Sequence, residues 1–369
     1  MGKNLKEVAL LFFKLGSIAF GGPAAHIAMM EDEVVKKRKW MTHQHFLDLV
    51  GATNLIPGPN STEMTMHCGH ERAGWKGLIV AGACFVFPAV VITMVLAWLY
   101  EKYGELPAVE PFIYGIKPAV IAIILGAVYR LGKKALKNVE LGILGALTLF
   151  ACLLGVHEII ALFSCGILGL IWYFIKQKKG SLNSFTPLIL LNLTVSVSSL
   201  KTLWIFFKVG ALLYGSGYVL FAYLDAELVA TGLLTRQELI DAVAIGQFTP
   251  GPVLSTATFI GWQLNGFWGA LAATIGIFLP SFIFVAILNP LIPKMRKSKT
   301  IGAFLDAVNI AAVAVIIAVC IEMGKDTLTD WRTILIAVAS IVAVFVFKKM
   351  NSAFIVIGGA LLGFCLTMF

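Results

Sequence analysis

Long apolar stretches alternate with short charged connections along most of the chain. An apolar run of about 20 residues is long enough to cross the ~30 Å hydrocarbon core of a bilayer as a helix. The pattern predicts membrane-spanning helices at residues 77–100, 112–129, 139–156, 158–175, 268–292, 301–323, 331–347 and 352–369. With the shorter apolar stretches included, we expect an all-α polytopic membrane protein with about 10–12 membrane segments.

Several of these elements occur twice in the same order. The copies are Phe12-Phe13-Lys14-Leu15-Gly16 and Phe206-Phe207-Lys208-Val209-Gly210 (194 residues apart), Pro57-Gly58-Pro59 and Pro250-Gly251-Pro252 (193 apart), and Gly74, Gly77 and Pro88 with Gly266, Gly269 and Pro280 (192 apart). The chain is therefore a duplicated unit. We expect a first repeat at 1–179, a linker at 180–200 and a second repeat at 201–369. The Ser/Asn/Thr-rich linker could also be a weak membrane segment.

Equivalent loops of the two halves carry opposite charge. Residues 101–110 hold three glutamates and one lysine, whereas the equivalent 294–299 hold four basic residues. One loop later the signs exchange, with four basic residues in 130–137 and three acidic ones in 322–330. Because Lys and Arg mark cytoplasmic loops, the same element should face opposite sides in the two halves. This pattern indicates two inverted-topology repeats with a pseudo-two-fold axis in the membrane plane; a parallel duplication with drifted charges is the alternative.

Each Pro-Gly-Pro triplet should interrupt a helix. Proline lacks an amide donor and Gly58 permits unusual dihedrals, so one helix should end before the triplet and another begin near Asn60, with Asn60, Ser61 or Thr62 as its cap. Residues 43–70 and 236–263 would then be re-entrant hairpins. Free N–H groups at a helix start favour anions. The candidate anion-binding residues are Asn54, Gly58, Asn60, Ser61 and Thr62 in the first half and Gln247, Gly251, Ser255 and Thr256 in the second.

A second pair of breaks lies nearer the start of each half. Phe20-Gly21-Gly22-Pro23 and Tyr214-Gly215-Ser216-Gly217 interrupt apolar helices, and Lys14 and Lys208 lie seven residues before these glycines. A lysine within an apolar run is a functional candidate, although one near a helix start can also snorkel to the interface. We add Gly21, Gly22, Gly215, Ser216, Lys14 and Lys208 to the candidate substrate-binding residues.

Acidic residues also recur in both halves. Glu31 and Glu33 are matched by Asp225 and Glu227, which suggests either proton coupling and gating or solvated loop charges. Glu63 is equivalent to Thr256 in the duplication, so the second half lacks this carboxyl. A carboxyl beside an anion site suggests a proton carrier. The matched Asp48 and Asp241 lie in the first turns of their helices, where an acidic residue stabilises a helix start.

Composition narrows the class of protein. The mean hydropathy is +0.89 and the net charge is +9, with the basic residues gathered in short loops as in membrane proteins and not in nucleic-acid-binding ones. The six cysteines form no CxxC pair, and the histidines have no acidic or cysteine cluster at metal-binding spacing. No P-loop or dinucleotide-binding glycine loop occurs. We therefore expect no enzyme activity, cofactor, metal or nucleic-acid partner; an embedded enzyme using Glu63, His67 and His70 lacks a nucleophile–base pair.

Two sequence features are similar to those of the chromate ion transporter (CHR) family. They are the motif Phe13-x-x-Gly16-x-x-x-Phe20-Gly21-Gly22-Pro23 and the duplicated Asn/Gln-x-x-Pro-Gly-Pro elements. The resemblance extends over both halves of the chain, as in the two-domain members of the family. It implies a bacterial or archaeal inner-membrane protein, with antiparallel halves, that exports chromate using the membrane potential or the proton gradient. The second half departs from the pattern at Gly215-Ser216-Gly217, which leaves the preferred ion open.

The physical chemistry allows more than one cargo. A tetrahedral dianion needs several donors and some positive charge, and sulfate has the same shape and charge as chromate. A transporter or channel for sulfate or another small anion is therefore the alternative. The expected partners are a chromate- or sulfate-like anion and the lipid bilayer; a homodimer is one oligomeric state that the sequence allows.

Overall fold

The computed structural model describes residues 2–19, 23–53, 56–104, 106, 109–177, 199–214, 217, 219–288, 298–347 and 350–367. The first half contains α1 (Gly2–Ile18), α2 (Pro23–Glu31), the π-helical η1 (Asp32–Lys37), α3 (His43–Thr53), α4 (Asn60–Tyr103), α5 (Glu110–Ala135), α6 (Val139–Leu153) and α7 (Glu158–Gln177). The second half contains α8 (Ser199–Leu212), α9 (Val219–Leu224), the π-helical η2 (Asp225–Val229), α10 (Arg236–Phe248), the 3-10 turn η3 (Val253–Ser255), α11 (Thr256–Leu288), α13 (Lys299–Thr327), α14 (Trp331–Val346) and α15 (Ser352–Thr367).

The apolar pattern of the sequence corresponds closely to these helices. Within the described ranges, five helices are long and apolar enough to cross a membrane, namely α4, α5, α7, α11 and α13, and three shorter apolar helices are α6, α14 and α15. Each of the eight predicted segments overlaps one of these helices. The expectation of an all-α polytopic membrane protein is therefore confirmed. Of the predicted linker, residues 199–200 begin α8 and the remainder lies outside the described residues.

The two longest helices are folded back on themselves at equivalent glycines. α4 has non-helical backbone at Ala73 and Gly74, where Gly74 has φ +64°, and α11 has it at Asn265 and Gly266, where Gly266 has φ +53°. The short first arm then lies against the long second arm. In α4 a Cβ on Gly69 would lie 2.3 Å from the carbonyl oxygen of Gly77. The recurring glycines thus permit a left-handed turn and a close backbone contact.

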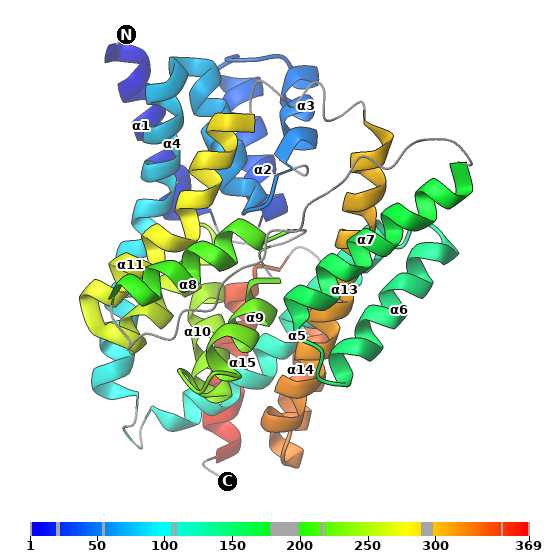
Figure 1. The fold of residues 1–369 in the computed structure, drawn as a ribbon. Coiled ribbons are helices and arrows are strands. Elements are labelled where there is room, and N and C mark those ends of the chain that lie inside the picture. Colours follow the sequence, from blue (N-terminus) through cyan, green and yellow to red (C-terminus); the bar gives the residue numbers. More distant parts are fainter. Residues whose placement is uncertain are drawn as a thin grey trace.

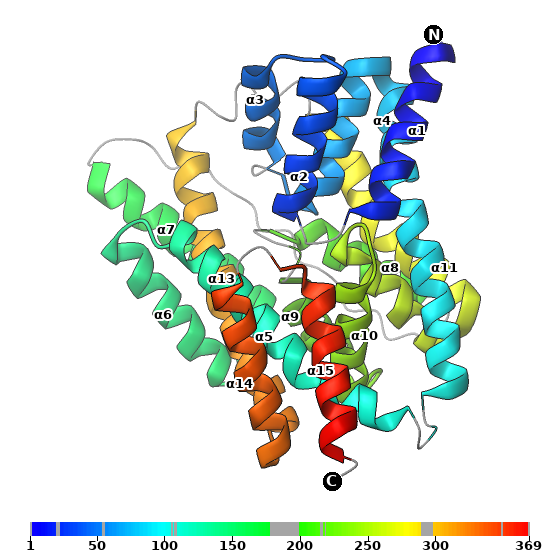
Figure 2. The ribbon, with the colours of Figure 1, turned by 180° about the vertical axis from the view of Figure 1, so that it is seen from behind.

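The helices of the two halves interlock. α1 packs on α4, α8 packs on α11, and α4 and α11 pack on each other. α5 of the first half packs against α14 and α15 of the second half, while α13 packs against α6 and α7 of the first half. Figures 1 and 2 show α13 beside α6 and α7, and α5 beside α14 and α15, from both sides. The N- and C-termini lie at opposite ends of the molecule.

Small residues make this exchange of helices compact. A Cβ on Gly115 of α5 would lie 2.7 Å from the Cα of Gly363 of α15, and a Cβ on Gly169 of α7 would lie 2.3 Å from the Cβ of Ala307 of α13. Gly115 is equivalent to Ala307, and Gly169 to Gly363, in the duplication. The same contact therefore occurs twice with the halves exchanged, and it allows membrane helices to approach closely.

Candidate functional site

The Pro-Gly-Pro triplets interrupt helices in both halves. α3 ends at Thr53 and α4 begins at Asn60, while α10 ends at Phe248 and helical structure resumes at Val253. Gly58 has φ +138° and Gly251 has φ +90°, a conformation that favours glycine. The residue before each new helix is a proline, Pro59 or Pro252, with no side-chain cap. The expectation that Asn60, Ser61 or Thr62 caps α4 is wrong, because Pro59 already holds the extended conformation of the cap position.

Each triplet is hydrogen-bonded to the other half of the chain. The amide of Gly58 donates to the carbonyl of Leu213 at 2.7 Å, and the amide of Gly251 donates to the carbonyl of Ala19 at 2.8 Å. Ala19 and Leu213 are equivalent residues that follow α1 and α8. The two hydrogen bonds are thus one contact made twice with the halves exchanged, so both breaks lie at the junction between the halves.

Gly58 and Gly251 each also contact the long helix of the opposite half. A Cβ on Gly58 would lie 2.3 Å from Oγ of Ser281 in α11, and a Cβ on Gly251 would lie 2.9 Å from Cβ of Ala89 in α4. Ser281 and Ala89 directly follow the equivalent prolines of the two long arms. Each turn therefore packs against the long arm of the opposite half, and a larger residue than glycine has no space at either position.

Buried hydroxyl and amide groups surround these turns. Ser61, Thr62, Ser255 and Thr256 are at most 2% exposed, whereas Asn60 is partly exposed. Thr256 donates its hydroxyl to the carbonyl of Val253. Oγ1 of Thr62, Oγ of Ser281 and Nε2 of Gln247 are buried near the turns and have no hydrogen-bond partner among the described residues. Such atoms are costly unless a polar ligand or water satisfies them.

Glu63 makes the site chemically asymmetric. Its side chain is fully buried, and neither carboxyl oxygen has a hydrogen-bond partner among the described residues. A Cβ on Gly58 would lie 2.2 Å from Oε1 of Glu63, so this carboxyl lies directly against the turn. The equivalent Thr256 has no acidic group, so the two breaks offer different chemistry to a ligand.

His26 lies beside the hydrogen bond between Gly251 and Ala19, and the sequence analysis did not identify it. Its side chain is buried, its Nε2 lies 3.0 Å from the carbonyl oxygen of Ala19, and this oxygen also accepts the hydrogen bond from Gly251. Nδ1 of His26 has no hydrogen-bond partner within the described ranges. The equivalent residue of the second half is Leu220, so the duplication carried no signal for this histidine.

The repeated lysines pair with the repeated glutamates. Nζ of Lys14 lies 3.9 Å from Oε1 of Glu33, and the Lys14 side chain is 60% exposed. Nζ of Lys208 lies 2.5 Å from Oε2 of Glu227, and both of these side chains are nearly buried. The same pair thus occurs in each half, but Glu33 also pairs more closely with Lys37 and Arg38.

The other two matched acids hold the starts of the next helices. Oε1 of Glu31 lies 3.2 Å from Nδ1 of His43, and Oδ1 of Asp225 lies 3.1 Å from Nε of Arg236. His43 and Arg236 are the first residues of α3 and α10, the helices that lead into the Pro-Gly-Pro turns. The hydrogen bond to Asp225 and the charge of this carboxylate raise the pKa of Arg236. These basic partners stand at equivalent positions, a signal that the sequence contained.

Asp241 has a different environment from the one its position suggested. Thr235 and Glu238 form the capping box of α10, so Asp241 does not stabilise this helix start. It accepts a hydrogen bond from the hydroxyl of Tyr100 at 2.6 Å and forms an ion pair with Lys117 at 3.3 Å. Both partners belong to the first half of the chain. The capping expectation for Asp241 is therefore wrong.

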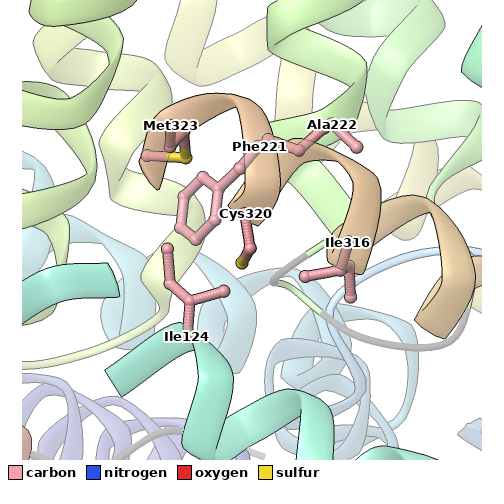
Figure 3. Close-up of a pocket in the computed structure, with 7 residues that line it drawn as sticks. Ile124, Phe221, Ala222, Ile316, Cys320 and Met323 are labelled. Atoms are coloured by element: carbon pink, nitrogen blue, oxygen red, sulfur yellow. The ribbon is translucent and has the colours of Figure 1, made fainter. Parts of the chain in front are cut away.

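Two further observations limit where a ligand can bind. Among the described residues, no group of three His, Cys, Asp or Glu side chains could hold a metal ion. A small pocket between α5, α9 and α13 has only apolar lining residues and sulfur groups, including Ile124, Phe221 and Cys320 (Figure 3). This pocket offers no donors to an oxyanion. Gly21, Gly22, Asn54, Gly215 and Ser216 lie outside the described residues.

The helices and the buried polar turns define an all-α, multi-pass membrane protein with two copies of one helix-break element. The chain belongs to the chromate transporter family, because the family model described as "Chromate transporter" matches residues 6–170 and again residues 200–364. The two matches cover both halves. Membership of a transporter family agrees with a non-enzymatic role, and the family resemblance noted in the sequence is confirmed.

Several relatives are similar over nearly the full length. The chromate transport protein of Cupriavidus metallidurans is 31% identical over 98% of this chain and 92% of its own length. The probable chromate transport protein of Synechococcus elongatus is 31% identical over 98% of this chain and 95% of its own. The chromate transport protein of Pseudomonas aeruginosa is 27% identical over 95% of this chain and 90% of its own. No solved structure matches the chain.

Proposed function

We propose that this protein is a secondary transporter that exports chromate across the inner membrane, and that the oxyanion binds at the two Pro-Gly-Pro breaks. The observation that carries the proposal is the pair of crossed hydrogen bonds from Gly58 to Leu213 and from Gly251 to Ala19. They bring two uncapped helix starts to the junction of the halves. Uncapped helix starts offer N–H groups and a positive dipole end to an anion.

The proposed architecture is an inverted repeat. The exchanged loop charges support it, and so do the reciprocal packing of α5 and α13 and the crossed contacts of the two glycines. In this arrangement the basic loops at 36–39 and 130–137 are cytoplasmic, and the loop at 101–110 is outside. The glutamates and the aspartate that pair with Lys14, Lys208, His43 and Arg236 would then act as gates, since they tie together the helices that precede each Pro-Gly-Pro break.

A tetrahedral dianion would find complementary groups at this site. The hydroxyls of Thr62 and Ser281 and the amide of Gln247 have no hydrogen-bond partners among the described residues, and they would donate to its oxygens. Gly58 and Gly251 are buried, so the anion reaches the site only after one side of the molecule opens. Opening of the two sides in turn would give alternating access by rocking of the halves.

The membrane potential would drive export. Moving one charge through 100 mV is worth about 2.3 kcal/mol, so a dianion leaving an inside-negative cell gains about 4.6 kcal/mol. Glu63 adds a proton to the cycle. Its buried carboxyl beside the turn would repel the anion when ionised, so it would be neutral whenever the anion is bound.

Chromate flux in proteoliposomes tests the proposal. Purified protein should move chromate down an imposed membrane potential, and a Thr62→Val variant, which keeps the side-chain shape but loses the hydroxyl, should raise the half-saturating concentration. Thr367→Val is the matched control, because Thr367 is bonded to its own helix at the C-terminal end of α15. Sulfate is added as a competitor. Absence of chromate flux, or equal inhibition by an equimolar amount of sulfate, would show that chromate is not the preferred cargo.

A further inference from the structure

A charged cluster lies between the two halves and away from the Pro-Gly-Pro turns. Nζ of Lys117 in α5 is 3.3 Å from Oδ1 of Asp241 in α10, and the hydroxyl of Tyr100 in α4 donates to Oδ2 of Asp241 at 2.6 Å. The side chains of Lys117 and Asp241 are 14% and 5% exposed. The two side chains of this ion pair thus lie nearly buried where α4 and α5 each pack on α10.

The cluster lies between the proposed site and one end of the molecule. Lys117 is seven residues into α5, or about 10 Å from its start at 1.5 Å per residue, and Tyr100 is near the end of α4. Asp241 precedes Thr249 by eight residues, which places it about 12 Å along α10 from the Pro-Gly-Pro turn. The end in question carries the acidic loop 101–110, which the proposed topology assigns to the outside.

Neither the duplication nor stability explains this pair. Lys117 is equivalent to Asn309, and Tyr100 to Ile292, so the second half lacks the same cation and hydroxyl. A buried ion pair contributes little net stability, because the desolvation of both charges offsets their attraction. Ionisable residues within the membrane are expensive, and their presence points to a functional role.

We infer that Lys117 is a second binding position for the transported oxyanion, on the outer side of the site at the turns. This inference rests on the proposed function. While the position is empty, Asp241 neutralises Lys117; when the anion leaves the central site, its oxygens replace the Asp241 carboxylate beside Lys117 and Tyr100. The exchange suits a tetrahedral oxyanion, which presents the same kind of charged acceptor as the carboxylate.

The position of Asp241 links this exchange to the central site. Asp241 lies on α10, whose C-terminal end leads into Gly251, and Gly251 is hydrogen-bonded to Ala19 of the other half. A movement that breaks the hydrogen bond of Gly251 therefore displaces the helix that carries Asp241. The outer cation becomes available to the anion when the turn of the second half opens.

Chromate uptake by vesicles of known orientation tests the inference. The half-saturating chromate concentration is measured separately from the outer and the cytoplasmic face for wild type, Lys117→Gln, Asp241→Asn and the double variant. Lys117→Gln should raise the outer value roughly tenfold, the effect of losing one charge-assisted contact, with little change on the cytoplasmic face. Asp241→Asn should lower the outer value, because Lys117 is then not neutralised.

The double variant separates binding from folding. It leaves no unpaired buried charge, so it should fold, yet it should show the raised outer value of Lys117→Gln. Lys102→Gln is the control, because Lys102 is an exposed cation near the same end that stacks on Trp98. Normal wild-type flux with an unaltered outer value in the double variant overturns this inference and leaves the proposed function intact. Absence of wild-type chromate flux overturns both.

Discussion

Replacement of Glu63 by glutamine is the most informative perturbation of the proposed site. Glutamine keeps the size of the neutral acid but has no titratable proton. Glu63 is fully buried, its oxygens have no hydrogen-bond partners among the described residues, and it lies against Gly58. An ionised carboxylate there is costly to bury and repels a dianion. The proton should therefore bind together with the anion and cross the membrane in the same direction.

The charge that moves per cycle gives the magnitude of the effect. A dianion alone carries two charges, worth about 4.6 kcal/mol at 100 mV, whereas a dianion with one proton carries one, worth about 2.3 kcal/mol. Each 1.4 kcal/mol is a factor of ten in concentration ratio. Without a pH gradient, wild type should therefore sustain a chromate ratio of roughly 50, and Glu63→Gln a ratio of roughly 2,000.

The assay is the chromate ratio at zero net flux in proteoliposomes held at about 100 mV by a potassium gradient and valinomycin. An added pH gradient should shift the ratio in wild type and have no effect in Glu63→Gln. Asp32→Asn is the control, because Asp32 is an exposed acid paired with Lys36 and Lys37, and it should behave as wild type. Equal ratios in wild type and Glu63→Gln, or a pH response that survives in the variant, would refute the reasoning.

Three further outcomes follow from the same contacts. Lys208→Met should lower the free energy of unfolding by about 3–5 kcal/mol, because it leaves a nearly buried glutamate unpaired. Lys14→Met should cost at most about 1 kcal/mol, because Lys14 is exposed and Glu33 keeps its ion pairs with Lys37 and Arg38; equal unfolding temperatures in detergent would contradict this. Gly251→Ala should lower the unfolding temperature more than Gly155→Ala, because both have positive φ but only Gly251 has atoms within 4 Å of the added Cβ. Ser281→Ala should weaken chromate binding without loss of stability, since its hydroxyl has no partner among the described residues; unchanged binding would remove Ser281 from the site.

Much of the local structure was predictable because it depends on neighbouring residues. The eight apolar segments became helices because hydropathy and length are properties of each segment alone. The break before Asn60 followed from two prolines and a glycine, which remove donors and permit a positive φ at Gly58. The folds of α4 and α11 lie at the recurring Gly74 and Gly266, which hold positive φ.

The chemistry of the site was less predictable because it depends on distant partners. Asp241 was expected to stabilise a helix start from its position in the sequence, yet its partner Tyr100 is 141 residues away. The acid–base pairs of Lys14 and Lys208 join elements within one half, but nothing local in either lysine indicated which carboxylate would hold it. His26 is matched by Leu220 in the second half and so left no repeated pattern to find.

The sequence by itself determined the positions of the apolar helices, the positions of the Pro-Gly-Pro breaks and the duplication of the unit. These features arise from hydropathy, from missing amide donors and from the dihedral freedom of glycine, all of which act over a few residues. Only the tertiary structure decided which groups meet. The crossed hydrogen bonds of Gly58 and Gly251, and the exchange of α5 and α13 between the halves, arise from the packing of helices that lie far apart in the chain. Packing of this kind depends on the shapes of several helices at once, so no single segment encodes it.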